Sequence, residues 1–528
     1  MGYESLRDWM KALDKAGELK RVTAEVSPIL EMAEIADRTS KSGKGTEKAG
    51  GPALLFENVA GYPGARVLMN QFGSTKRMQM ALEVNSLDEI SGRIETLIHP
   101  VAPTGMLDKL KMLPMLAEMG GYFPRTISAK NAPCKEVILR GDDIDVLKFP
   151  VLKTWPEDGG RFITLPCVIT QNPNNGKRNV GMYRMQVYDG KTTGMHWQRQ
   201  KVAAEHARER MRAAAEDIAG QVEIMAVTAG GTTAAGEHTM PQHVVTKIRG
   251  ERMEVAVVIG TDPATTFSAI VPAPPDVEEY LIAGFLRQQA VELVRCETVD
   301  LEVPAHAEIV IEGYVELGEL RTEGPFGDHT GFYTMQDQYP VFHITCITHR
   351  KDPIYAATVV GKPPMEDTWM IKSVERIFLP LMKLTIPEII DINLPAEGVA
   401  HNLMIVSIRK SYAGQARKVM HAIWGLGQAM FTKCIVVVDE DCDVQDVGEV
   451  MLRVGNNIDP ERDIQFTMGP VDTLDHASRL PNYGSKMGID ATRKWAAEGF
   501  TRSWPTMMTM PKEVTARMDA VWKELGIG

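Results

Sequence analysis

Two carboxylates, Glu323 and Asp328, stand five residues apart in the stretch RTEGPFGDHTGF, residues 321–332. The residues between them are Gly-Pro-Phe-Gly, so proline stiffens part of the turn while glycine leaves the rest conformationally free. Two carboxyl groups that are held at different places around one bound molecule could act as an acid and a base. The same spacing also fits two acids that only cap a turn, so both interpretations stay open.

An arginine and several amides precede this stretch in runs that look like strands. Alternation predicts a strand over 180–188, in which Arg184 and Gln186 point to the same face. A solvent-facing strand residue would explain Arg184 equally well, and Asn179 fits an ordinary turn. The run TTGMHWQRQK, at 192–201, carries more hydrogen-bonding groups than a core strand usually has.

A helix is predicted within PAPPDVEEYLIAGFLR, residues 272–287, with acids in its first turn. The simplest explanation of Glu278 and Glu279 is a favourable interaction with the helix dipole. No stretch of the chain is a strong motif by itself. We find no Walker loop, no Gly-x-Ser-x-Gly elbow and no His-Glu-x-x-His pair.

Length and composition predict a globular protein of several domains. The chain has 528 residues, of which 44% are hydrophobic and 24% are charged, and this length suggests two to four domains. A net charge of −11 and the lack of a dense basic stretch argue against nucleic acid or an anionic membrane as partner. Without a signal-peptide core, a long apolar run or a Cys-x-x-Cys pair, we expect a cytoplasmic protein with reduced cysteines and no integral membrane segment.

The pattern changes twice along the chain, which predicts three domains. Residues 1–118 mix helical stretches with a short strand, as in an α/β domain. Residues 119–352 are rich in β-like runs, interrupted by a predicted helix at 202–221. In residues 353–528, apolar strands alternate with helical patterns, which predicts a second α/β domain.

Taken together, these stretches resemble the UbiD family of reversible decarboxylases, which use prenylated FMN. The resemblance runs through nearly the whole chain, in order. It is carried by EIADRT, GPALLFEN, NQFGSTKRM, TWPED, NVGMYRMQ, TTGMHWQR, TDPAT, DLEVPAHAEIVIEG, EGPFGDHTG, YAGQARKVM and GSKMGIDAT. The resemblance implies an N-terminal α/β domain, a central split β-barrel that binds the flavin, and a C-terminal α/β domain that builds oligomers.

The resemblance also implies roles for individual residues. Arg184, Glu323 and Asp328 match the family's catalytic triad. Glu323 is expected to pair with Arg184 and stay ionised, because a guanidinium favours the carboxylate form. This pair would hold the substrate carboxylate, and Asp328 would donate the proton that replaces it. Residues expected around the cofactor are Asn179, Met182, Tyr183, Arg184, Gln198, Arg199, Gln200 and Glu279.

The expected metal site departs from the family pattern at one ligand. Family members hold the flavin phosphate through a divalent ion with Asn, His and Glu ligands, often with a potassium ion nearby. Asn179 and Glu279 match, but the histidine position falls on Gln200. A glutamine oxygen suits Mn²⁺ or Mg²⁺, although it is a weaker ligand than imidazole. A second departure is an insertion at about 207–250, which could be a lid, an oligomer contact or a substrate wall.

The function implied is non-oxidative, reversible decarboxylation of an aromatic acid, whether a hydroxybenzoate, a quinone precursor or an aryl-CoA acid. A flavin prenyltransferase would supply the cofactor, and a homodimer or homohexamer is expected. The alternative is a non-catalytic scaffold or cofactor-binding homologue with a degraded metal site. Gln200 favours that alternative, whereas the intact Arg184, Glu323 and Asp328 disfavour it. An FMN oxidoreductase would leave the two acids without a role.

Overall fold

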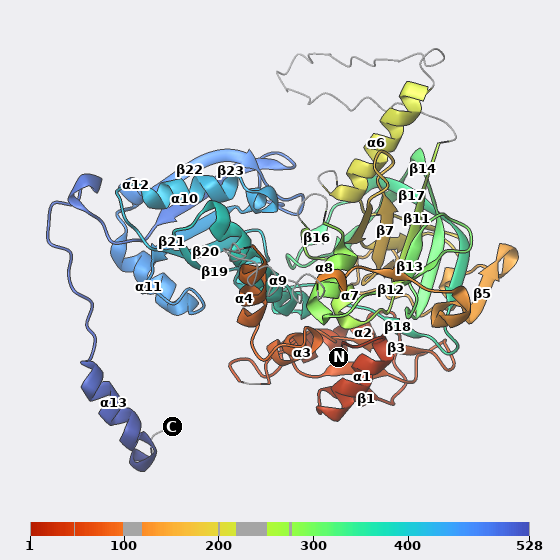
Figure 1. The fold of residues 1–528 in the computed structure, drawn as a ribbon, viewed down its shortest axis with the longest axis horizontal. Helices are drawn as coiled ribbons and strands as arrows, with labels where there is room; N and C mark the ends of the chain where they lie inside the picture. Colours follow the sequence, from red (N-terminus) through yellow and green to blue (C-terminus); the bar gives the residue numbers. More distant parts are fainter. Residues whose placement is uncertain are drawn as a thin grey trace, which may run out of the picture.

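The computed structural model describes residues 2–46, 48–98, 119–198, 201–217, 251–273 and 277–526. Three sheet-based units follow one another along the chain, and Figure 1 shows them as the red, yellow-to-green and blue parts. This arrangement confirms the expected mixture of α/β and β domains.

The N-terminal unit packs helices on a four-stranded sheet of order β1-β2-β3-β18. Helix α1 buries Leu6, Trp9 and Leu13, which lie on one face because they recur at helical spacing. Strand β18 comes from the segment assigned above to the C-terminal domain, yet it pairs in parallel with β3. The elements are α1 (Leu6–Lys15), β1 (Leu19–Val22), α2 (Glu31–Ser40), β2 (Ala53–Phe56), β3 (Arg66–Met69), α3 (Thr75–Ala81), α4 (Asp88–Ile98) and β18 (Ile354–Ala356).

The central unit is a curled, nine-stranded sheet, as the predicted split barrel requires (Figure 1). Its long strands β14 and β17 pair antiparallel along most of their length. The strands are β5 (Val137–Arg140), β6 (Arg161–Ile163), β7 (Cys167–Gln171), β8 (Arg178–Met182), β9 (Met185–Val187), β10 (Thr192–Gly194), β11 (Arg252–Ile259), β14 (Ile309–Glu323) and β17 (Asp337–His349). Around them lie β4 (Arg125–Thr126), α6 (Val202–Asp217), α7 (Pro263–Ser268), α8 (Glu279–Arg287), β12 (Glu292–Arg295), β13 (Glu302–Pro304), β15 (Phe326–Gly327) and β16 (Tyr333–Thr334).

The C-terminal unit is a five-stranded sheet of order β19-β20-β21-β23-β22, reached through the long helix α9. Helix α9 packs against α4 and so lies between the units in Figure 1. The elements are α9 (Glu366–Thr385), β19 (Ile389–Asn393), β20 (Leu403–Ile408), α10 (Gln415–Trp424), β21 (Cys434–Asp439), α11 (Val447–Asn457), α12 (Pro460–Asp463), β22 (Ile464–Pro470) and β23 (Tyr483–Asp490). Beyond them an arm carries α13 (Lys512–Val521) away from the body (Figure 1).

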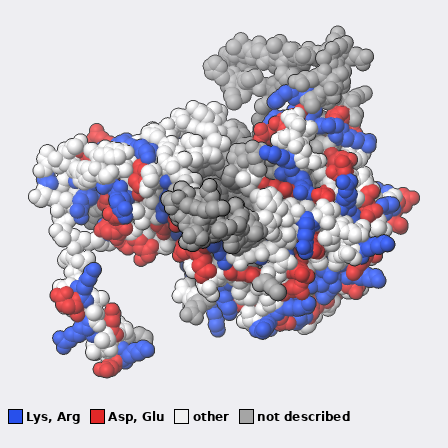
Figure 2. Space-filling view, in the orientation of Figure 1, with Lys and Arg blue, Asp and Glu red and all other residues white. Residues whose placement is uncertain are grey.

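The surface carries charges of both signs. On the face shown in Figure 2, acidic and basic side chains alternate over the central unit, whereas much of the upper C-terminal unit is uncharged. All six cysteines are free thiols, as predicted. Among the described residues, no helix has the length and apolar character needed to cross a bilayer.

Candidate active site

Arg184 lies in a break between two strands. The sequence predicted one continuous strand over 180–188, and this prediction was wrong: β8 ends at Met182 and β9 begins at Met185. The Arg184 carbonyl instead accepts a hydrogen bond from the His196 backbone N–H at 3.3 Å. Since Arg184 is outside the regular ladder, its side chain does not have to stand perpendicular to the sheet and can reach acids far away in the sequence.

Those acids are Glu323 and Asp328. The Arg184 Nε and Nη2 atoms lie 3.1 and 3.0 Å from Glu323 Oε1, and Nη1 pairs with Asp328 Oδ2. Nη2 also donates to Thr334 Oγ1 at 3.0 Å. Glu323 is 1% exposed and Asp328 is 8% exposed, so water contributes little to the stabilisation of either charge. The three residues of the expected triad therefore form one buried ion cluster.

Side chains from other segments hold the turn between the two acids through hydrogen bonds. The Gly324 N–H donates to Gln186 Oε1 at 2.8 Å, and the Gly327 N–H donates to Asp158 Oδ1 at 2.8 Å. Gly324 has φ +96°, a conformation that favours glycine. The Phe326 ring lies under the Arg184 guanidinium, whose carbon is 4.6 Å from the ring centroid. The Gly-Pro-Phe-Gly turn thus keeps the two carboxylates on opposite sides of one arginine.

Glu323 is held as a carboxylate by two partners. Burial raises its pKa, but hydrogen bonds from His196 and Arg184 outweigh burial, and the net result is a lowered pKa. The pKa of His196 is lowered, chiefly by its own burial. Glu323 is therefore equipped to orient Arg184, with His196 fixing its second oxygen.

Asp328 has a second partner that the sequence interpretation missed. The His329 Nδ1 atom lies 2.9 Å from Asp328 Oδ1, and the His329 backbone N–H donates to the same oxygen at 2.7 Å. Burial opposes the charge on Asp328, yet His329 and Arg184 hold the pKa of this carboxyl well below its usual range. Burial also opposes a charge on His329, but its bond to Asp328 raises its pKa to about 9. These two pKa shifts favour the proton of the pair on His329, whereas the role of Asp328 as the acid that faces the substrate stays a prediction.

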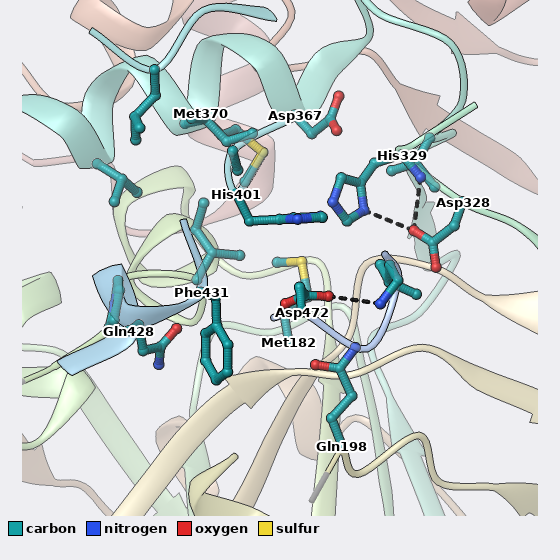
Figure 3. A pocket seen from close by; sticks show the side chains of 18 of the residues that line it. Met182, Gln198, Asp328, His329, Asp367, Met370, His401, Gln428, Phe431 and Asp472 are labelled. Atoms are coloured by element: carbon teal, nitrogen blue, oxygen red, sulfur yellow. Dashed lines mark hydrogen bonds and ion pairs between the residues drawn. The ribbon is translucent and has the colours of Figure 1, made fainter. Parts of the chain in front are cut away.

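A cavity of about 450 Å³ opens beside the ion cluster. One wall is formed by the central unit and the other by α9 and the C-terminal unit, and Figure 3 shows side chains from both walls around it. Most of the wall is apolar, with α9 contributing Met370, Ile371, Val374 and Phe378. The predicted cofactor residues that line it are Met182, Tyr183, Arg184 and Gln198. Arg199 and Gln200 lie outside the described residues, as does most of the 207–250 insertion.

Two of the three expected metal ligands, Asn179 and Glu279, come from the neighbouring elements β8 and α8. Glu279 Oε2 accepts the backbone N–H of Val180 at 2.8 Å, which puts the carboxylate next to Asn179. Burial raises the pKa of Glu279 to about 7, and the neighbouring charge of Glu278 adds to this effect. The buried Asn179 Nδ2 atom has no hydrogen-bond partner among the described residues, although the side chain lies beside the Tyr183 phenol. A buried carboxylate and a neighbouring asparagine, which would offer its amide oxygen, are the kind of ligands that a hard divalent ion accepts.

In the described parts of the chain, no three His, Cys, Asp or Glu side chains gather around one point where they could hold a metal ion. The expected ligands Asn179, Gln200 and Glu279 would not form such a group, because only Glu279 belongs to those four residue types. Asn179, Gln200 and Glu279 all stay predictions as metal ligands, and only Asn179 and Glu279 lie within the described residues.

Further polar residues of the cavity were not singled out from the sequence. They come from five separate segments and include His329, Lys201, Asp367, His401 and Asp472. Only His329 had a visible signal, because it follows an acid within a turn that the sequence had marked. The others become neighbours only when the C-terminal unit closes over the central one.

The chain matches all three domains of one family, described as 3-octaprenyl-4-hydroxybenzoate carboxy-lyase. The N-terminal domain matches residues 10–94, the Rift-related domain 125–363 and the C-terminal domain 368–491. An uncharacterized protein of Archaeoglobus fulgidus is 50% identical over 526 residues, which are 99% of each chain.

Two solved enzymes share the fold along the full chain. Vanillic acid decarboxylase of Sedimentibacter hydroxybenzoicus, in its closed form, is 25% identical with a TM-score of 0.79 and 100% of each chain covered. The UbiD-class enzyme HmfF of Pelotomaculum thermopropionicum, in complex with FMN, is 28% identical with a TM-score of 0.73 over 95% of this chain and 97% of its own. A dimeric form of HmfF, evolved and in complex with prFMN, is 26% identical with a TM-score of 0.71 over 97% of this chain and 98% of its own. With a buried arginine–carboxylate cluster, a largely apolar cavity and all three domains matched, this chain belongs to the UbiD family of carboxy-lyases.

Proposed function

We propose that this protein catalyses the reversible, non-oxidative decarboxylation of an aromatic carboxylic acid with prenylated FMN as cofactor. The observation that carries the proposal is Arg184, buried between Glu323 and Asp328 at the edge of a mostly apolar cavity. The similar enzymes HmfF, bound to FMN and prFMN, and vanillic acid decarboxylase support the cofactor and the reaction class.

The flavin would lie against Met182, Tyr183, Arg184 and Gln198, the described residues on the central wall of the cavity. Its phosphate would be held through Mn²⁺ or Mg²⁺ by Asn179 and Glu279, with Gln200 as the expected third ligand, and potassium could add a further cation. When bound, the cofactor supplies the electron sink that makes loss of CO₂ feasible. The chain itself has to bind the acid, exclude water and deliver a proton.

The charge balance of the cluster suits the loss of a carboxylate. Arg184 and protonated His329 carry two positive charges, which offset the charges of Glu323 and Asp328. The acid group of the substrate would meet the Arg184 guanidinium at the mouth of an apolar cavity. An apolar cavity solvates a charged carboxylate poorly, whereas neutral CO₂ needs little solvation. The environment therefore favours loss of CO₂. Glu323 and His196 keep Arg184 oriented throughout.

The proton that replaces CO₂ on the ring carbon would reach it through Asp328. In the resting structure both Asp328 oxygens accept hydrogen bonds, so this carboxylate has no proton of its own to give. His329 Nδ1 lies 2.9 Å from Asp328 Oδ1, so a proton on this nitrogen would point at the carboxylate. It would move to Asp328 and then to the carbon, while bulk water restores the proton on His329. In the carboxylation direction the same steps run in reverse.

The test is Asp328→Asn in protein that is co-expressed with a flavin prenyltransferase. The variant should keep its cofactor absorption spectrum and lose about 10²- to 10⁴-fold in turnover, the usual range for a general acid. Intact mass of the released cofactor identifies prenylated FMN independently of activity. Wild-type turnover in Asp328→Asn would remove Asp328 from the reaction, and a cofactor-free wild type after reconstitution would favour the non-catalytic homologue.

Assembly into a homodimer or homohexamer is part of the proposal and is expected to use the C-terminal unit. Strand β22 is an edge strand of its sheet, and Phe466 and Met468 on it are 72% and 46% exposed. Figure 2 shows this upper region as largely uncharged. Light scattering of the purified protein, compared with Phe466→Lys, measures whether this surface joins copies of the chain.

A further inference from the structure

Asp367 lies in the first turn of helix α9, on the same cavity wall as His329. In Figure 3 its carboxylate lies beside the His329 ring, and Asp328 lies on another side of that ring. Nδ1 of His329 faces Asp328 Oδ1 at 2.9 Å, so Nε2 is the nitrogen that is left for a further partner. Asp367 thus belongs to the surroundings of His329 although it comes from a different element of the fold.

The start of α9 fixes the position of Asp367. Glu366, the residue before it, accepts the backbone N–H of Phe72 at 2.7 Å and the hydroxyl of Thr358 at 2.7 Å. These bonds tie the first turn of the helix to two other segments of the chain. Asp367 Oδ1 accepts the backbone N–H of Thr368 at 3.0 Å, a favourable arrangement for an acid at a helix N-terminus. Oδ2 is left to face the cavity.

A second, smaller cavity of about 10 Å³ lies between α9 and the segment before β20, and both His329 and Asp367 line it. This volume suits about one water molecule. Val399 and Ala400 line it from the C-terminal unit, with φ +42° and +68°. Residues other than glycine keep such left-handed conformations only where surrounding contacts hold them. The cavity therefore offers a place for one water that bridges Asp367 and Nε2 of His329.

The groups next to His329 favour a positive charge on its ring. Those that carry or can carry charge are Asp328, Asp367, Asp472 and the ring of His401, which meets the His329 ring edge to face with centroids 5.4 Å apart. Burial opposes a charge on His329, but the bond to Asp328 and the charges of the three acids raise its pKa to about 9. Of the two acids outside the Asp328 pair, Asp367 contributes more than Asp472.

Other charged side chains of the cavity wall have partners of their own. They include Arg184 with Glu323 and Asp328, Glu375 with Lys372 and Arg376, and Lys201 near Asp472. Burial lowers the pKa of His401, so its ring is neutral near pH 7. The balance of charge around His329 is therefore negative, which favours its protonated form.

Asp367 is ionised over the pH range in which His329 holds its proton. Burial raises the pKa of Asp367 to about 6, although the positive charge of His329 opposes this increase. Between pH 6 and 9, an anionic Asp367 therefore faces a cationic His329. A carboxylate on one side of a histidine ring orients the ring and stabilises its charged form.

We propose that Asp367 is a positioning residue that keeps His329 charged and oriented, with Nδ1 directed towards Asp328. This inference rests on the proposed function for the passage of the proton from His329 to Asp328. In that step the Nδ1–H bond breaks as the O–H bond of Asp328 forms, and the proton on Nε2 stays in place. Asp367 acts only through His329 and gives no proton to the substrate.

The test compares the pH profile of turnover for the wild-type holoenzyme and for Asp367→Asn. Loss of an opposite charge beside His329 should lower the pKa of the histidine by about one unit, so turnover above pH 9 should fall about tenfold. Turnover at pH 7 should change little, because His329 is still protonated there. Asp367→Glu keeps the charge and should restore the wild-type profile. Asp472→Asn should move the profile less, and Asp88→Asn, an exposed acid that pairs with Arg376 on α9, is the matched control.

An unmoved alkaline limb in folded Asp367→Asn, or a larger shift in Asp472→Asn, would overturn the proposal. Histidine-labelled NMR of the holoenzyme tests it without turnover, with the His329 signal identified by its loss in His329→Gln. In the wild type this signal should titrate at about pH 9 and also shift near pH 6, where Asp367 gains its proton. A wild-type signal without the step near pH 6 would refute the positioning role even if Asp367→Asn fails to fold. Both steps in a protein that decarboxylates nothing would support the role of Asp367 and contradict only the proposed function.

Discussion

Replacing His329 by glutamine should change the pH dependence of catalysis and not only its rate. Glutamine can still donate a hydrogen bond towards Asp328, but it has no proton to transfer. The variant therefore separates the positioning of Asp328 from the supply of its proton. If Asp328 is reprotonated by His329, turnover in the two proteins must fall with rising pH over different ranges, at a much lower pH in the variant.

The expected size of the pH effect follows from the shifted pKa of His329. Its pKa rises from 6.5 to about 9, against the effect of burial, because of the bond to Asp328. At about 1.4 kcal/mol for each pKa unit, the pair favours the imidazolium by about 3 kcal/mol. For a raised pKa, this stabilisation is complete below pH 6.5 and is lost as the pH rises through about 9. Wild-type turnover should therefore be flat up to pH 8 and fall about tenfold per unit above pH 9.

In His329→Gln, Asp328 has to take its proton directly from solvent. Turnover at pH 8 should fall about 100-fold or more, and it should rise again as the pH is lowered towards 5. Release of CO₂ and uptake of solvent deuterium into the product measure the rate, and the cofactor spectrum shows that the site is loaded. His343→Gln is a matched control, since His343 pairs with Glu319 at 2.6 Å on the surface of β17. A His329→Gln enzyme with wild-type turnover and the same alkaline limb would refute the reasoning.

Three further predictions concern the backbone before His401 and the metal site. Val399→Gly should lower the thermal unfolding midpoint, because loss of the buried valine side chain, worth about 1.5 to 3 kcal/mol, outweighs the strain of about 1 kcal/mol that glycine relieves at φ +42°; a raised midpoint in calorimetry would contradict it. Mn²⁺ affinity should fall about tenfold per unit below pH 7, because Glu279, with a pKa of about 7, must lose its proton to bind a cation; titration calorimetry between pH 5.5 and 8 checks this, and a flat profile speaks against Glu279 as ligand. Gln200→His should bind the metal about 10- to 100-fold more tightly and should retain more flavin when it is purified beside the wild type. Equal and full metal and flavin occupancy in both proteins would show that Gln200 is a competent ligand.

Local patterns in the sequence predicted the elements well. Helix α1 follows from the spacing of Leu6, Trp9 and Leu13, and the mixed α/β and β fold class follows from where strand-like and helical periods replace one another. The UbiD resemblance pointed to Arg184, Glu323 and Asp328 because ordered motifs survive in the sequence even when each is short. These features depend on neighbours within a few residues or on an order along the chain, and both can be read without coordinates.

Contacts over long distances could be decided only by the tertiary structure. Alternation predicted an unbroken strand through Arg184, because the partners that draw it out of the ladder lie 139 and 144 residues away. Strand β18 joins the N-terminal sheet although it follows the whole central unit. His401 has no local signal in the sequence, since its ring comes from the C-terminal unit and meets His329 of the central unit only at the cavity. Periodicity reports which face of an element is apolar, whereas the chemistry of this site arises where faces of separate elements meet.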